Sequence, residues 1–204
     1  LSLLVHNDGS QVRSDTSMAY RQTYGAVGSF DPGGVVLGGE FYFQGGKNGD
    51  KNRVRAFLVA LHATVQTERT PLTLGFDLLS GTGRDDEQDR SFAPLYGTNH
   101  KFYGFMDYFY VGNTHGQAAS PSGLLDAYLK TNFRLAEKST LLAHLHVFSS
   151  PVPIYEGPAV DATTRRYLGT EADLVYTLQI LEDLRLNVGY SHMFAGESLE
   201  TIKG

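Results

Sequence analysis

The segment PLTLGFDLLS, at residues 71–80, decides the fold. In an extended chain Leu72, Leu74 and Phe76 fall on one face, and Asp77 falls on the other. This period of two is typical of a β-strand with one apolar face, whereas an amphipathic helix would repeat its apolar residues every three or four positions. The segment therefore predicts a strand whose two faces meet different surroundings.

The same alternation recurs along the chain. In the segment 165–179, Leu168 and Leu174 share the apolar row, and Glu171 and Asp173 share the polar row. Helical periodicity is poor nearly everywhere. We predict about nine strands, at residues 1–6, 17–28, 34–44, 53–66, 71–80, 123–134, 140–148, 165–179 and 184–194.

Composition excludes several classes of protein. The 204 residues are enough for one domain, and no apolar run approaches the roughly 18 residues that a membrane helix needs. Cysteine is absent, so there are no disulfides, thiol nucleophiles or cysteine metal sites. The net charge of -5 provides no basic stripe, so we expect no nucleic-acid partner.

Alternation alone fits two architectures, because a soluble sandwich or barrel turns its apolar face inward and a membrane barrel turns it outward. The lengths of the connections favour the membrane barrel. Short connections, at 29–33, 67–70, 135–139 and 180–183, alternate with longer ones at 7–16, 45–52, 81–122 and 149–164. Outer-membrane barrels have tight turns at one end and long loops at the other. The sequence thus predicts an all-β, antiparallel up-and-down transmembrane barrel that occupies residues 1–204, with a long loop at 81–122.

Several segments resemble one family of outer-membrane proteins. They are GGEFYFQGG (38–46), GFDLLSGTG (75–83), YGTNHKFYGFMDYFY (96–110), SGLLDAYLK (122–130), LGTEADLVY (168–176) and NVGYSHMF (187–194). Together they are similar to the alginate-export family of porins, in particular to the versions found in Bacteroidetes-type bacteria. The resemblance implies a monomeric barrel of about eighteen strands, an even number as bacterial barrels require. This chain would then be a fragment that holds the C-terminal half without its closing strand.

Polar residues of the predicted strands are candidates to line a lumen. They are Arg21, Glu40, Tyr42, Gln44, Asp77, Asp126, Tyr128, Lys130, Asn132, Arg134, His144, His146, Glu171, Asp173, Arg185 and Asn187. Their charges are mixed and slightly acidic, whereas a conduit for a polyuronate should be lined by Arg and Lys. We expect a non-enzymatic channel for small hydrophilic solutes, with saccharides or an alginate-like polyuronate as the substrate class and outer-membrane lipid as its surroundings. The alternative is a soluble carbohydrate-binding β domain.

The segment 81–122 begins with charged residues and continues with many aromatic ones. We interpret it as a loop that folds into the lumen and narrows it. The candidate residues for this constriction are Tyr96, His100, Phe102, Tyr103, Asp107 and Tyr108. The alternative is an extra strand at 101–111, which would change the strand count and the sides on which later loops lie.

Metal and enzyme sites are weakly indicated, and we expect no cofactor. The cluster Asp85, Asp86, Glu87 and Asp89 could bind calcium, but its spacing is not that of an EF-hand and a solvated loop is the better interpretation. The histidines that could suggest zinc are His100, His115, His144, His146 and His192. His144 and His146 share one face of a strand, yet two ligands do not close a zinc site and the sequence identifies no third, so we interpret them as hydrated lumen residues.

A hydrolase is the remaining alternative. Ser80, His100 and Asp107 are available as nucleophile, base and orienting group, but no G-x-S-x-G elbow is present.

Overall fold

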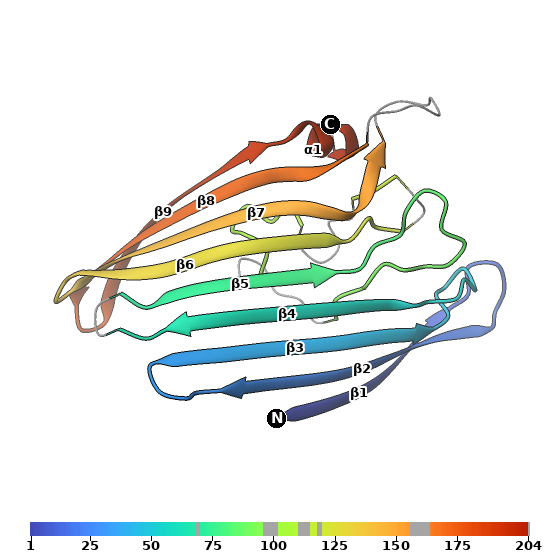
Figure 1. Ribbon diagram of the computed structural model, residues 1–204, viewed down its shortest axis with the longest axis horizontal. Helices are drawn as coiled ribbons and strands as arrows, with labels where there is room; N and C mark the ends of the chain where they lie inside the picture. Colours follow the sequence, from blue (N-terminus) through green and yellow to red (C-terminus); the bar gives the residue numbers. More distant parts are fainter. Residues whose placement is uncertain (68–69, 96–101, 110–114, 118–119, 156–163, 204) are drawn as a thin grey trace.

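Nine antiparallel strands follow one another in a single sheet, and their spatial order is their order in the chain (Figure 1). The computed structural model describes residues 1–67, 70–95, 102–109, 115–117, 120–155 and 164–203. The strands are β1 (Ser2–Gln11), β2 (Met18–Phe30), β3 (Val35–Gly46), β4 (Ala56–Val65), β5 (Leu72–Leu79), β6 (Leu124–Ala136), β7 (Ser139–Tyr155), β8 (Thr164–Leu181) and β9 (Leu184–Ala195). One short helix, α1 (Glu197–Lys203), follows the last strand.

Most connections at one end of the sheet are longer than those at the other, as the sequence predicts, but the predicted long connection between β1 and β2 (12–17) and the predicted short one between β4 and β5 (66–71) both have six residues. Residues 31–34, 137–138 and 182–183 form tight turns at one end. In the first of these turns Gly33 and Gly34 have φ angles of 104° and 78°, a left-handed backbone that favours glycine. The connection between β5 and β6 lies at the other end and crosses one face of the curved sheet (Figure 1).

The described residues contain no helix that is long and apolar enough to cross a membrane.

All nine predicted strands exist, but β1 and β7 are much longer than predicted. β1 continues to Gln11, because its polar second half pairs with β2 although it lacks the apolar alternation on which the prediction depends. Here the side-chain amide of Gln22 donates a hydrogen bond to Asn7 (3.0 Å). β7 continues to Tyr155 through a proline-containing stretch that pairs irregularly with β8. The connections predicted at 7–16 and 149–164 are correspondingly shorter.

The two faces of the sheet have opposite chemistry and opposite exposure. We call the face that carries Leu74 the apolar face, and the face that carries Asp126 the polar face. The side chain of Leu74 is 64% exposed, whereas Asp126 is 1% exposed. The apolar residues Leu61, Leu129, Leu145, Leu174 and Val188 are also exposed on the apolar face. The sheet therefore exposes the side chains that a water-soluble sheet buries.

The buried apolar core lies on the polar face, at the end of the sheet with the long connections. Phe148 of β7 and Phe109 of the β5–β6 connection pack with ring centroids 4.7 Å apart. Leu199 of α1 belongs to the same buried cluster. Leu168 also belongs to it, which corrects the prediction that Leu168 lies in the apolar row with Leu174. The register between β7 and β8 shifts next to this residue, and such an irregularity reverses the face on which the following side chains point.

Candidate functional site on the polar face

Cross-strand register places every predicted lumen-lining residue on the polar face. In the centre of the sheet Asp77 pairs with Asp126, and further along Tyr128 pairs with His146, which pairs with Glu171. The same register places the other predicted residues on this face: Arg21, Glu40, Tyr42, Gln44, Lys130, Asn132, Arg134, His144, Asp173, Arg185 and Asn187. The strands therefore bring together all the polar residues that the alternation selected.

Burial along this face changes from one end of the sheet to the other. Near the long connections Gln44, Asp126 and Glu171 are fully buried, because other parts of the chain cover them. Towards the tight turns Asn132 and Arg185 are exposed. The polar face is thus covered at one end and open at the other.

The segment 102–109 forms part of that cover. It consists of bends and turns, so the alternative prediction of a strand at 101–111 is wrong over these residues. Within this segment the side chains of Tyr103 and Phe109 are buried, those of Asp107 and Tyr108 are half-buried, and that of Phe102 is exposed. Tyr96 and His100, the other two predicted constriction residues, lie outside the described residues.

Glu171 of β8 holds this segment against the sheet. Its Oε1 accepts backbone hydrogen bonds from Phe105 (2.6 Å) and Met106 (2.9 Å). The ring of Phe105 also packs against His144, with centroids 5.3 Å apart. Burial, together with the nearby charges of Asp77 and Asp126, raises the pKa of the Tyr103 hydroxyl, so this phenol stays neutral.

Gln44 of β3 anchors an earlier part of the same connection. Its side-chain amide donates to the carbonyl of Ala93 (2.8 Å), and its Oε1 accepts from the Ala93 N–H (2.9 Å). The same amide also reaches Thr23 of β2 (3.2 Å). Sequence reasoning did not assign Gln44 this role, because nothing in a strand pattern says which loop backbone will lie above it.

Two residues of the acidic segment at 85–89 stabilise the loop. Asp86 accepts a hydrogen bond from the Gly83 N–H (2.8 Å) and forms an ion pair with Arg90 (3.3 Å). Asp89 is buried, lies 3.6 Å from the guanidinium of Arg21, and accepts from the Asn48 amide (2.9 Å). Asp85 and Glu87 are exposed. Asp86 and Asp89 are therefore each bonded to neighbouring protein groups and do not share a common partner.

The predicted histidines separate into different environments. His115 lies in the long connection, where its Nε2 is 2.8 Å from the carbonyl of Gly123. His192 lies on the apolar face, stacked on Tyr190 and in edge contact with Phe194 (4.5 Å), on the opposite side of the sheet from His144 and His146. His100 lies outside the described residues.

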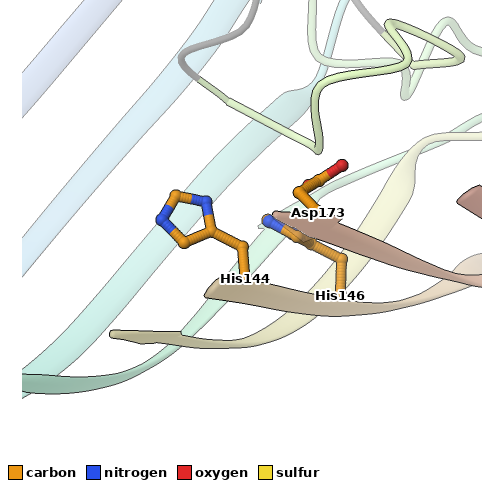
Figure 2. A group of neighbouring side chains, drawn as sticks. All are labelled: His144, His146 and Asp173. Carbon is orange, nitrogen blue, oxygen red and sulfur yellow. The ribbon is translucent and has the colours of Figure 1, made fainter. Parts of the chain in front are cut away.

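His144 and His146 meet a third group that the sequence did not identify. Figure 2 shows both rings projecting from β7 beside Asp173 of β8. One ligand atom from each of the three lies within 4.8 Å of the other two. Among the described residues this is the one group of three or more His, Cys, Asp and Glu side chains close enough to share a metal ion. Asp173 could have been found from the sequence only with the β7–β8 register, which pairs it with His144.

Ser80, the nucleophile of the hydrolase alternative, is held by backbone groups. Its hydroxyl donates to the carbonyl of Arg90 (2.7 Å) and accepts from the N–H of Phe57 (2.8 Å). Among the described residues no histidine is bonded to it. Its observed role is to join the long connection to β4.

Comparisons with known proteins do not assign the chain to a family. No protein-family model matches it, and no curated protein matches it.

Proposed function

We propose that the chain is part of a porin-like β-barrel channel in a bacterial outer membrane. One observation carries this proposal: the alternating rows of the sheet expose apolar side chains and cover charged ones. Leu74 is 64% exposed, and Asp173 is 0% exposed. In water this exposure would be costly, because each exposed apolar side chain forgoes about 1.5–3 kcal/mol of burial. Lipid removes that cost, and closure of the sheet would place the polar face around water.

The aromatic residues of the apolar face support a membrane boundary. Tyr24 of β2, Phe43 of β3 and Phe57 of β4 are cross-strand neighbours near the long connections, and all three are exposed. Phe30 and Phe133 are exposed towards the tight turns. Aromatic girdles at both edges of an apolar band are typical of outer-membrane barrels.

The length of the strands and their connections is consistent with this interpretation. β6, β7 and β8 have 13, 17 and 18 residues, and a tilted strand needs about 9–11 residues to cross the bilayer. The long connections would face the cell exterior and the tight turns the periplasm. We further propose that the segment 102–109 narrows the lumen, since it lies across the polar face and is bonded to Glu171.

Small hydrophilic solutes, saccharides included, are the cargo that we propose. The polar face carries both signs of charge, and its buried members are mainly carboxylates: Asp77, Asp126, Glu171 and Asp173. A conduit dedicated to polyanions should show the opposite sign. The resemblance to alginate-export porins therefore remains a prediction about the family, and export of a polyuronate is the less favoured cargo.

Two measurements test the proposal. A folded barrel migrates anomalously on a detergent gel until it is heated, so the purified full-length protein should show heat-modifiable migration. A chain that is folded and monodisperse without detergent would instead support the soluble carbohydrate-binding alternative.

In planar lipid bilayers the same protein should produce discrete conductance steps with a weak preference for cations. An absence of steps would contradict the channel.

A further inference from the structure

We propose that His144, His146 and Asp173 bind a divalent transition-metal ion of the zinc type. This site goes beyond the proposed channel, because its three ligands come from the β7–β8 pair and do not depend on closure of the sheet. His144 and Asp173 are direct cross-strand partners, and His146 is two residues from His144 on the same face. Their ligand atoms converge within 4.8 Å, beneath the long connection (Figure 2).

His146 is held by a carboxylate in an orientation that suits a metal ligand. Its Nδ1 lies 2.8 Å from one carboxylate oxygen of Asp126 and 3.0 Å from the other, and both side chains are 1% exposed. A carboxylate at Nδ1 keeps the proton on that nitrogen and leaves the Nε2 lone pair free for a metal. The Nε2 of His146 is buried and has no hydrogen-bond partner among the described residues. Carboxylate, imidazole and metal in this order are the usual arrangement around protein zinc ions.

Asp173 is a fully buried acidic residue. Neither of its carboxylate oxygens accepts a hydrogen bond from an N–H group or a hydroxyl in the described part of the chain, although the residue is 0% exposed. Its side-chain neighbour is the carboxyl group of Glu171, which is itself buried. A carboxylate buried without partners is costly, so buried charges are normally paired or coordinate a metal. The Nδ1 of His144 is likewise buried without a partner among these residues. Three unsatisfied groups of metal-ligand chemistry thus meet at one point.

Acidic side chains gather around the three proposed ligands. Asp77 is the cross-strand partner of Asp126, and Glu171 precedes Asp173 by two residues on the same face. Like charges placed directly opposite each other destabilise a sheet. Lys130, the cross-strand partner of His144, lies over the ring of Tyr128 at 4.3 Å from its centroid and offsets only part of this negative charge. A bound dication would offset the surplus of negative charge.

The donor set selects the class of ion. Two imidazoles and one carboxylate suit Zn²⁺ and similar first-row metals, whereas Ca²⁺ and Mg²⁺ prefer sets made of oxygen ligands. Glu171 is not one of the three ligands, and its Oε1 already accepts the N–H groups of Phe105 and Met106. Three protein ligands leave one position of a tetrahedral ion for water.

Metal binding to the full chain tests the site. The folded protein in detergent is stripped with a chelator and titrated with Zn²⁺ alone in a calorimeter. We expect one equivalent to bind, and Asp173→Asn and His146→Ala to weaken binding at least about tenfold. His192→Ala is the matched control, because this histidine lies on the opposite face, and it should bind as the unmodified chain does. Failure of the unmodified chain to bind Zn²⁺, or unchanged binding by both site variants, would overturn the proposal.

A second measurement does not depend on the folding of the variants. X-ray absorption of the Zn²⁺-loaded unmodified chain should show a low-coordinate ion with two imidazole ligands. A spectrum with oxygen ligands alone would refute the site even if Zn²⁺ binds. Asp126→Asn should keep the imidazole signature and lower the affinity by about 10–100-fold, since it removes the negative charge beside His146 Nδ1 and not a ligand.

Discussion

Gly104 of the long connection lies directly against the carboxylate of Glu171 in β8. A Cβ atom at residue 104 would be 2.4 Å from Oε1 and 2.7 Å from Oε2. The backbone there also has a φ of 84°, which side chains rarely adopt. The next two N–H groups, of Phe105 and Met106, bind Oε1. The absence of a side chain at residue 104 thus lets the backbone of the long connection approach Glu171 of β8.

Gly104→Ala should therefore release the loop. The new methyl group meets the carboxylate, and the residue is strained, so we expect a loss of about 1–3 kcal/mol in the stability of the docked segment. Chymotrypsin, which cleaves after aromatic residues, should cut the segment 102–109 faster than in the unmodified chain. Gly28→Ala is the control, because the nearest atom to its Cβ would be 3.7 Å away, an ordinary contact. Equal cleavage of both variants would show that the close approach is unimportant.

Glu171→Ala should expose the same loop through a different cause. The substitution leaves the N–H groups of Phe105 and Met106 without their acceptor, which costs about 1–3 kcal/mol. Hydrogen exchange at these two amides should accelerate by roughly ten- to a hundredfold. Glu171→Gln keeps an oxygen that accepts both bonds, so its effect should be smaller. If Gln and Ala behave alike, the carboxylate and not the hydrogen-bond geometry holds the loop.

Arginine substitutions on the two faces should have unequal effects. Leu74→Arg puts a charge on the exposed apolar face, and Asn132→Arg puts one on the exposed part of the polar face. For a lipid-facing residue near the bilayer centre we expect a loss of about 2–4 kcal/mol in the free energy of unfolding in lipid vesicles. Asn132→Arg should change it by less than about 0.5 kcal/mol, as surface substitutions usually do. Equal effects would argue against lipid on the apolar face.

The ion pair between Asp15 and Lys51 joins two loops, and their stability should therefore depend on pH in the acid range. Asp15 accepts hydrogen bonds from Lys51 and from Ser17, and these lower the pKa of its carboxyl from 3.8 to about 2. The folded-state pKa is below the unfolded value, so the contribution to stability is present above pH 3.8 and is lost as the pH falls through about 2. Amide exchange at Ser17, whose N–H binds Asp15 (2.7 Å), should rise over this range. Asp15→Asn should abolish that pH dependence, and high salt should weaken it because both side chains are exposed.

The strands and their faces could be predicted because alternation is a local property. Leu72, Leu74 and Asp77 each lie on the face that the pattern assigns to them. The extension of β7 could not be predicted, because Pro151 and Pro153 interrupt the pattern. Leu168 was misplaced for a related reason: a register shift between strands leaves no mark in the alternation of one strand.

The three-ligand cluster and the docked loop depend on distant pairs of residues. Phe105 and Glu171 are 66 positions apart, and no composition or spacing connects them. Asp173 meets His144 only because β7 and β8 pair in one particular register, and a slip of a single residue would turn Asp173 to the other face. The sequence alone predicts that His144 and His146 lie together, because both belong to one strand. It does not indicate which residue of the neighbouring strand lies beside them.

The order β1 to β9 has a consequence for how such a sheet can change in evolution. Over the residues that the structure describes, each strand of the sheet is bonded to its neighbours in the chain, so β1 pairs with β2, β2 with β3, and so on to β9. A duplicated hairpin can therefore join the sheet between two existing neighbours without any other pair changing partners. Loss of a hairpin leaves the remaining pairs equally intact. The number of strands in a sheet of this kind can thus grow or shrink two at a time, while each surviving hairpin keeps its own side chains in place.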